Sequence, residues 1–83
     1  MSFYVYLLIS KSKNNKLISY VGYTNNLNKR LIKHNSNKGA KATKGYNWEL
    51  IFKKGFKTKS AAMSYEYKLK KDRKKRSIIL KSI

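Results

Sequence analysis

Five polar side chains of this sequence carry functional groups suited to proton transfer and to the binding of ions. Two of them are the phenols of Tyr6, in the triplet Tyr4-Val5-Tyr6, and of Tyr20, in the triplet Tyr20-Val21-Gly22. Arg30 and His34 follow ten and fourteen residues after Tyr20. An imidazole titrates near neutral pH, and a guanidinium binds two oxygens at once. Glu66 adds a carboxylate, which hard cations prefer as a ligand. These groups can act together only if the fold gathers them.

Two β-strands are predicted near the N-terminus, one for each triplet. Phe3–Ile9 is rich in aromatic and β-branched residues, and Leu17–Tyr23 resumes that pattern after the polar run Ser10–Lys16. The short connection favours an antiparallel hairpin. This pairing would place the phenols of Tyr6 and Tyr20 on adjacent strands.

A helical period follows the second strand. Leu27, Leu31 and His34 recur at helical spacing, and the asparagine at position 25 or 26 can act as the N-cap. These features predict a first helix over about residues 26–34. On that helix Arg30 and His34 stand four residues apart, so their side chains project from the same face.

The middle of the chain is predicted to hold a loop and a third strand. Asn35–Tyr46 has no hydrophobic period and contains glycines and lysines, which is typical of a surface loop. Trp48–Phe52 predicts the third strand, and Gly55 marks its end. We expect Trp48 and Phe56 in the core.

A second helix is expected after Thr58 or Ser60, either of which can cap it. Four side chains share one face of this helix: Ala62, Tyr65, Glu66 and Leu69. An acid on an otherwise apolar face needs a reason. That reason is either a functional role for Glu66 or a simple pair with Lys70 one turn later.

The C-terminal part of the chain holds the basic run Lys70–Arg76 and the apolar tail Ser77–Ile83, and periodicity leaves the tail open between helix and strand. The element order β-β-α-β-α, with a possible short terminal element, predicts an α+β (mixed α/β) fold. We expect one small domain over residues 1–83, with a three-stranded, mostly antiparallel sheet flanked by helices.

The charge of the chain indicates a polyanionic partner. Lys and Arg number 21 against three acidic residues, which gives a net charge of +18. Codon bias of an AT-rich genome explains abundant Lys, Asn and Ile, but it does not remove Asp and Glu. We therefore expect nucleic acid as the partner, with ribosomal, viral or anionic-membrane roles as alternatives.

Composition also excludes several classes of protein. A chain that is 41% hydrophobic and 13% aromatic is too apolar for a disordered basic tail. With no cysteine and one histidine, it predicts neither a disulfide scaffold nor a thiolate zinc site, so any metal would bind oxygen ligands. Phe3–Ile9 is too short to cross a bilayer, and no signal-peptide pattern precedes it. We expect a cytoplasmic protein without a membrane partner, associated with the nucleoid if the host is bacterial.

The ordered set of both triplets, Arg30, His34 and Glu66 resembles the motif of the GIY-YIG nuclease superfamily. Tyr4-Val5-Tyr6 stands where the family has Gly-Ile-Tyr, and Tyr20-Val21-Gly22 stands where it has Tyr-Ile-Gly. Within the superfamily, the chain looks most like the catalytic domain of the eukaryotic structure-specific endonuclease that resolves branched DNA, and like small stand-alone bacterial proteins. The segments that carry this closer likeness are Tyr20-Val-Gly-Tyr-Thr24, Lys38-Gly-Ala-Lys41, Trp48-Glu49, Gly55-Phe56 and Ser60-Ala-Ala62.

The resemblance implies a metal-dependent endonuclease that hydrolyses phosphodiester bonds, on branched or damaged DNA in repair or recombination. It implies that Glu66 binds Mg²⁺ (or Mn²⁺), that Tyr6 and Tyr20 orient or deprotonate the attacking water, that Arg30 stabilises charge on the phosphate and that His34 relays a proton. Which tyrosine is the base stays open. We expect the surrounding positive charge to lower the phenol pKa from its usual value of about 10. All five side chains should converge on one concave surface.

The chain also departs from the family pattern. Tyr4 replaces the first glycine, Tyr23 occupies a place where some relatives carry a lysine, and no asparagine follows Glu66 where several nucleases use one. The phosphate contacts near the metal can therefore differ. The cysteine-rich module of the eukaryotic enzyme has no counterpart in this sequence, so an unidentified protein partner could supply the specificity.

Binding to DNA is expected to be mainly electrostatic, steeply dependent on salt and guided by backbone shape rather than base sequence. The expected phosphate contacts are Lys38, Lys41, Lys44, Lys68, Lys70, Lys71, Arg73 and Arg76. Two alternatives remain. One is a nucleic-acid-binding module of the same fold with little or no catalysis, and the other is a basic RNA-associated protein in which the motif is coincidental.

Overall fold

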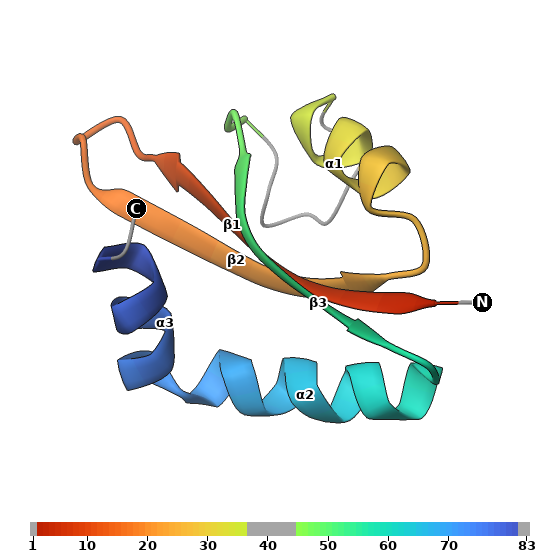
Figure 1. Ribbon diagram of the computed structural model, residues 1–83. Coiled ribbons are helices and arrows are strands. Elements are labelled where there is room, and N and C mark those ends of the chain that lie inside the picture. The colour runs from red at the N-terminus through yellow and green to blue at the C-terminus, as the bar shows by residue number, and fades with distance from the viewer. Residues whose placement is uncertain (1, 37–44, 82–83) are drawn as a thin grey trace.

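The computed structural model describes residues 2–36 and 45–81. Strands β1 (Phe3–Lys11), β2 (Leu17–Thr24) and β3 (Glu49–Phe56) form one antiparallel sheet in the order β2-β1-β3. Helix α1 (Leu27–Asn35) lies on one side of the sheet, and helices α2 (Lys59–Lys71) and α3 (Arg73–Lys81) lie on the other, as Figure 1 shows. This arrangement confirms the predicted α+β fold with three strands.

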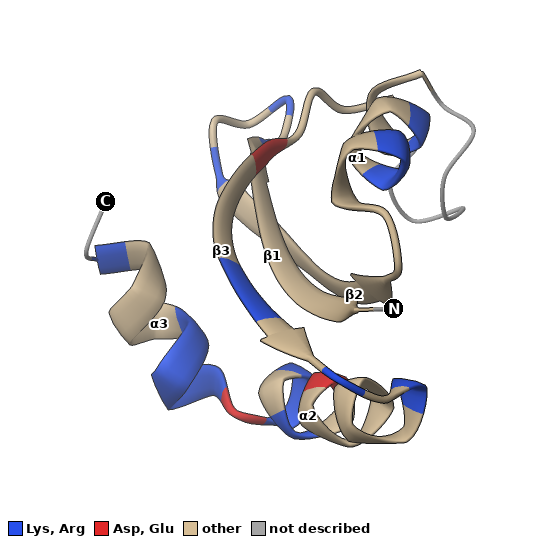
Figure 2. Cartoon of the chain, turned by 45° about the vertical axis from the view of Figure 1, so that its right-hand side comes forward, with Lys and Arg blue, Asp and Glu red and all other residues tan. Residues whose placement is uncertain are grey.

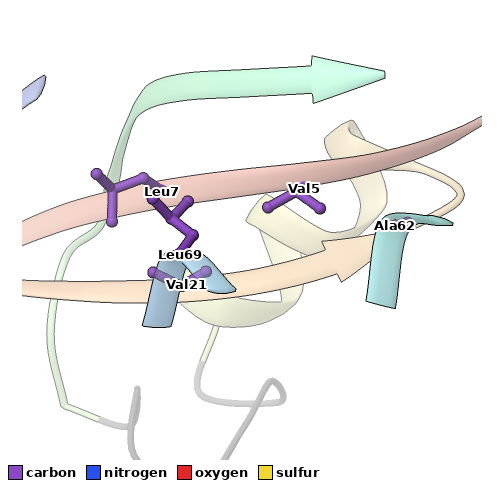
Figure 3. Close-up of a cluster of buried hydrophobic side chains, with 5 residues drawn as sticks. All are labelled: Val5, Leu7, Val21, Ala62 and Leu69. Atoms are coloured by element: carbon purple, nitrogen blue, oxygen red, sulfur yellow. The ribbon is translucent and has the colours of Figure 1, made fainter. Parts of the chain in front are cut away.

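The central strand β1 is buried on both faces. Its residues Val5, Tyr6, Leu7 and Leu8 are all at most 2% exposed. Since side chains alternate along a strand, two separate hydrophobic clusters form. On the α2 side the cluster consists of Val5, Leu7, Val21, Ala62 and Leu69 (Figure 3). On the α1 side it consists of Tyr6, Leu8 and Trp48, with Leu27 and Leu31 of α1 packed against it.

The predicted hairpin between β1 and β2 is confirmed, with a tighter turn than the polar run suggested. Ser10 and Lys11 still pair with β2, and the turn closes through hydrogen bonds from the Ser12 amide to the Lys16 carbonyl and from the Asn15 amide to the Ser12 carbonyl, both 2.9 Å. Asn15 has a φ of 60°, which asparagine tolerates better than most residues. The register sets Tyr6 opposite Gly22.

The prediction that Gly55 marks the end of the third strand was wrong. β3 runs from Glu49 to Phe56, and Gly55 pairs with Tyr4 inside the ladder. The long central strand offers backbone partners along its whole length, and this pairing outweighs the local preference of a glycine for a turn. Trp48 is buried as predicted, while Phe56 is half-buried against the α2 side of the sheet.

The caps of both predicted helices are now assigned. Asn26 rather than Asn25 caps α1, since its side chain accepts a hydrogen bond of 3.1 Å from the Lys29 amide. Thr58 rather than Ser60 caps α2, with a bond of 3.1 Å from the Ala61 amide. Each helix therefore begins within a residue or two of its predicted start.

The C-terminal segment is a third helix. Asp72 ends α2 and then accepts a 3.0 Å hydrogen bond from the Lys75 amide, so it also caps the start of α3. Most of the basic run and the apolar tail thus belong to helices. Among the described residues, no helix is long and apolar enough to cross a membrane.

Candidate active site

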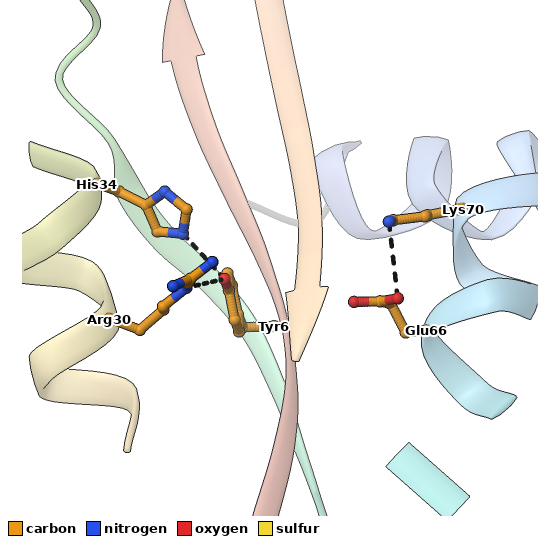
Figure 4. A network of polar contacts seen from close by, with 5 residues as sticks. All are labelled: Tyr6, Arg30, His34, Glu66 and Lys70. Atoms are coloured by element: carbon orange, nitrogen blue, oxygen red, sulfur yellow. Dashed lines mark hydrogen bonds and ion pairs between the residues drawn. The ribbon is translucent and has the colours of Figure 1, made fainter. Parts of the chain in front are cut away.

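Four of the five predicted site residues meet on the α1 side of the sheet. Tyr6 comes from β1, Tyr20 from β2, and Arg30 and His34 from one face of α1; we call these four residues the tyrosine cluster. The Tyr6 hydroxyl lies 2.9 Å from Nε2 of His34, and Nε of Arg30 donates to the same hydroxyl at 3.4 Å (Figure 4). The cluster therefore centres on the oxygen of Tyr6.

Tyr20 joins the tyrosine cluster through its ring. The ring centroids lie 5.1 Å from His34, 6.5 Å from Tyr6 and 6.3 Å from Trp48, all at tilted angles. These distances are within the range of favourable aromatic contacts. Because Tyr20 is only half-buried, it is the more solvent-accessible of the two phenols.

Gly22 gives the Tyr6 phenol its position. A Cβ atom built at Gly22 would collide with the Tyr6 hydroxyl and lie 2.6 Å from Tyr6 Cζ. The phenol therefore lies directly over the backbone of β2, in the space that any other side chain would fill. The glycine of the second triplet was apparent in the sequence. That Gly22 makes room for Tyr6 follows only from the strand register, which sets the two residues opposite each other.

Asn35 holds the end of α1 against the start of β3, a role that sequence analysis missed. Its side-chain amide donates to the Trp48 carbonyl at 3.2 Å, and its oxygen accepts from the Trp48 amide at 2.6 Å. This paired contact fixes the last turn of α1, which carries His34. The interaction spans 13 residues, so no local pattern could have indicated it.

The hydrogen bonds assign a direction to the protons. Arg30 Nε can only donate, so the Tyr6 oxygen accepts that bond. The proton of the buried phenol is then available for Nε2 of His34, which fits a neutral imidazole protonated on Nδ1. The path from Tyr6 to His34 is thus set for transfer of a proton out of the phenol.

Burial decides the pKa of Tyr6. Removal of the phenol from water raises its pKa above 10.0, and the nearby Arg30 guanidinium opposes this shift without cancelling it. The expectation of a lowered pKa was therefore wrong for Tyr6. The positive charge of the chain could be read from the sequence, but the burial of Tyr6 could not. In the structure Tyr6 is only 2% exposed.

His34 is held neutral. Burial lowers its pKa below 6.5, and the charge of Arg30 lowers it further. The hydrogen bond to Tyr6 raises the pKa of Arg30, which stays protonated throughout. At neutral pH the Tyr6 phenol is therefore bonded to a neutral imidazole and to a guanidinium.

The buried histidine predicts a pH dependence of stability. Because the folded pKa of His34 lies below its unfolded value of 6.5, the unfolded chain binds more protons, and the free energy of unfolding should fall as pH drops below 6.5. The uptake of one proton sets an upper limit of about 1.4 kcal/mol per pH unit on this slope. Urea denaturation between pH 7.5 and 5 measures it.

The matched control is His34→Gln, which keeps an acceptor for Tyr6 but does not titrate. His34 is the only histidine of the chain, so the variant should lose the slope in this pH range. An unchanged slope in the variant would contradict the assignment.

Glu66 approaches from the other side of the sheet. It lies on α2, with its side chain 17% exposed and its Oε1 3.6 Å from Nζ of Lys70. Strands β1 and β2 pass between Glu66 and the tyrosine cluster (Figure 4). The structure therefore gathers four of the five predicted residues. The carboxylate lies behind β1 and β2, where its charge adds to the rise in the Tyr6 pKa that burial causes.

A metal would find few protein ligands here. Within residues 2–36 and 45–81, no group of three or more His, Asp or Glu side chains lies together. Of the three acidic residues, Asp72 caps α3 and Glu49 is exposed on β3. Glu66 is therefore the best candidate for a metal ligand. A single carboxylate with a weak lysine contact fits Mg²⁺, which keeps most of its waters and binds substrate phosphates.

The basic residues are spread over the molecule. Figure 2 shows Lys and Arg on α1, β3, α2 and α3 rather than on one face. Of the expected phosphate contacts, Lys68, Lys70, Lys71 and Arg73 are exposed, and Arg76 is half-buried with an Nε that lacks a partner among the described residues. Three further expected contacts, Lys38, Lys41 and Lys44, lie outside the described residues. Their part in DNA binding stays a prediction.

Comparison with known proteins identifies the family. The model of the GIY-YIG catalytic domain matches residues 2–78. The chain belongs to the GIY-YIG nuclease domain family, whose activity implies DNA as the substrate. The resemblance inferred from the two triplets is thereby confirmed.

The relatives include small bacterial proteins. The chain is 46% identical over 77 residues to UPF0213 protein YazA of Bacillus subtilis (strain 168), covering 90% of this chain and 76% of that protein. It is 43% identical over 65 residues to Uncharacterized protein L300 of Acanthamoeba polyphaga mimivirus, covering 72% of this chain and 39% of that protein. The solution NMR structure of UPF0213 protein BH0048 from Bacillus halodurans is 36% identical, with a TM-score of 0.48, over 99% of this chain and 84% of that one.

Proposed function

We propose that this protein is a metal-dependent endonuclease that hydrolyses phosphodiester bonds in DNA, with branched or damaged DNA in repair or recombination as its substrate. The observation that carries the proposal is the hydroxyl of Tyr6, which contacts an imidazole and a guanidinium at once. A phenol with these two partners can receive a proton from water while it passes its own proton on.

The reaction begins with removal of a proton from the attacking water. That proton goes to the Tyr6 oxygen as the phenol proton moves to Nε2 of His34, so the phenol never carries a full negative charge. Because burial keeps the imidazole neutral, its Nε2 can accept that proton, and the raised pKa of the phenol keeps Tyr6 protonated until the water supplies a replacement. The water oxygen bonds to phosphorus, the bond from phosphorus to the 3′ oxygen breaks, and that oxygen takes a proton from solvent.

Arg30 acts on the charge of the phosphate. Its Nε donates to Tyr6, and the guanidinium also has Tyr20 as a hydrogen-bond partner. A guanidinium carries five N–H donors, so N–H groups remain for phosphate oxygens. A positive charge placed beside the developing negative charge stabilises the transition state. The charge of Glu66 acts on the Tyr6 phenol across the intervening strands. A Mg²⁺ ion held by Glu66 would therefore add positive charge near the same phosphate.

Removal of the metal tests this proposal. Nicking of supercoiled, single-stranded and branched DNA should require Mg²⁺ or Mn²⁺ and stop in EDTA. Glu66→Gln should lower the rate in Mg²⁺ at least about 10²-fold, because the carboxylate is the charged ligand. Glu49→Gln is the control, since Glu49 is exposed on β3.

The pattern of substrates decides between the finer alternatives. Faster cleavage of branched than of linear DNA would support the proposed substrate. Absence of metal-dependent cleavage from all three substrates, with DNA binding intact, would contradict the nuclease proposal.

A second candidate is a DNA-binding module with little catalysis. Two observations favour it: Tyr6 is buried as a residue, and Oε1 of Glu66 lies 3.6 Å from Nζ of Lys70. In this case Glu66→Gln would change neither DNA affinity nor any cleavage rate. The same nicking assay therefore separates the two candidates.

A further inference from the structure

An open hollow lies beside the tyrosine cluster, at the end of the sheet where the chain begins. It has a volume of about 380 Å³ and is lined by Phe3, Tyr23, Thr24, Asn25, Arg30 and Lys59. Figure 1 shows why these residues meet, since the start of β1, the end of β2 and the start of α2 lie at the same end of the molecule. We call this feature the Lys59 hollow.

The charge of the Lys59 hollow selects an anion. Its two charged lining residues, Arg30 and Lys59, are both cationic, and none of its lining residues is acidic. Asn25, which is exposed, adds an amide that can donate to an oxygen. Phosphate oxygens are the groups that such a set of donors binds best.

The remaining lining residues indicate that the anion carries an organic part. Phe3 and Tyr23 contribute aromatic rings, and the volume falls within the roughly 300–1,000 Å³ of small-molecule sites. A lone phosphate ion would leave most of this space to water. A phosphate with its attached sugar and base would use both the cations and the rings.

Arg30 connects the Lys59 hollow to the chemistry. The same side chain that lines the hollow donates to the Tyr6 hydroxyl at 3.4 Å. It also lines a small apolar cavity beside Tyr6, Leu8 and Leu27. The Arg30 guanidinium therefore lies between the hollow and the proposed catalytic phenol.

We propose that the Lys59 hollow binds the nucleotide next to the cleaved phosphate, with Lys59 on its phosphate and Tyr23 against its sugar or base. The proposal rests on the proposed function in taking DNA as the source of the nucleotide. Lys59 is then a substrate-positioning residue that sequence analysis did not select from the 21 basic residues.

Binding without cleavage tests the Lys59 hollow directly. Metal-free protein in EDTA is titrated with the dinucleotide d(TpT) and with inorganic phosphate, and amide resonances are followed by ¹H–¹⁵N NMR. The dinucleotide should shift the amides of Tyr23, Thr24, Asn25 and Lys59. Lys59→Ala should weaken its binding about tenfold, because a hydrogen bond to a charged group is lost.

Two variants control for general electrostatics. Lys59→Arg keeps the charge and should retain most of the affinity. Lys13→Ala removes a charge in the distant hairpin turn and should change the affinity less than twofold.

Each other outcome overturns the proposal. Shifts confined to other parts of the chain, or equal losses for Lys59→Ala and Lys13→Ala, would show that the hollow is not the site. Inorganic phosphate that binds as tightly as d(TpT) would show a free-anion site instead. Because no metal or cleavage is needed, a protein that never nicks DNA can still pass this test, and an active nuclease can still fail it.

Discussion

Tyr6→Phe is expected to lower the rate of metal-dependent DNA cleavage by about 10²–10⁴-fold, the usual contribution of a general acid or base. The substitution removes one oxygen and keeps the ring that fills the α1 side of the sheet. That oxygen is the atom bound by both His34 and Arg30. Affinity for DNA, measured by fluorescence anisotropy in EDTA, should stay within about twofold because the basic surface is unchanged.

The same variant should lose some stability. His34 is fully buried, and its Nε2 would lose the phenol as a partner. The loss of a hydrogen bond at a buried polar group costs about 1–3 kcal/mol, which urea denaturation can resolve. A moderate loss of stability with a large loss of rate is the expected signature, since a purely structural tyrosine would change the first and leave the second nearly intact.

Tyr4→Phe is the matched control. Tyr4 lies two residues earlier on β1, is half-buried and contacts Gly55 rather than the tyrosine cluster. This variant should cleave DNA at close to the wild-type rate. If Tyr6→Phe also cleaves at that rate, Tyr6 has no role in proton transfer, and the half-buried Tyr20 becomes the candidate base.

The elements that could be predicted from the sequence are those with a strong local signal. The β1–β2 hairpin has two apolar runs around a polar turn, and α1 and α2 each have a helical period and a capping residue. The end of β3 and the helical tail lacked such signals. Gly55 belongs to β3 because β1 pairs with it, and α3 is helical because Asp72 caps it.

Four of the residues that form the candidate site could be predicted from the sequence, but the direction of the Tyr6 pKa shift could not. The spacing of Arg30 and His34 placed both on one helix face, and adjacent strands brought Tyr6 and Tyr20 near them. The sign of the Tyr6 pKa shift depends on burial beneath α1, which the sequence does not contain. The position of Glu66 behind β1 and β2 likewise depends on which side of the sheet α2 packs.

Contacts between residues far apart in the chain could not be predicted from the sequence. Asn35 binds Trp48 across the segment that links α1 to β3. Lys59 lines the same hollow as Arg30 because α2 begins beside the end of β2. Neither residue differs in type or spacing from many other asparagines and lysines of the chain, so only the folded arrangement distinguishes them.

Gly22→Ala is expected to damage both stability and activity. The new methyl group would occupy the position of the Tyr6 phenol, with its carbon 2.6 Å from Tyr6 Cζ. Since the ring is packed in the core, it must shift, at a cost of about 1–3 kcal/mol for an overpacked site. The shift would break the 2.9 Å bond to His34, so cleavage should fall as far as in Tyr6→Phe.

Gly55→Ala separates this effect from the general effect of replacing a strand glycine. Gly55 lies on β3 opposite Tyr4, and a Cβ there would meet the nearest ring atom at 3.5 Å, an ordinary contact distance. Alanine reduces the freedom of the unfolded chain, so Gly55→Ala should be neutral or stabilising by up to about 1 kcal/mol. Thermal unfolding and nicking assays on both variants give the comparison. Equal behaviour of the two alanine variants would mean that the β2 backbone tolerates a side chain at position 22, and that the Tyr6 phenol can react from more than one position.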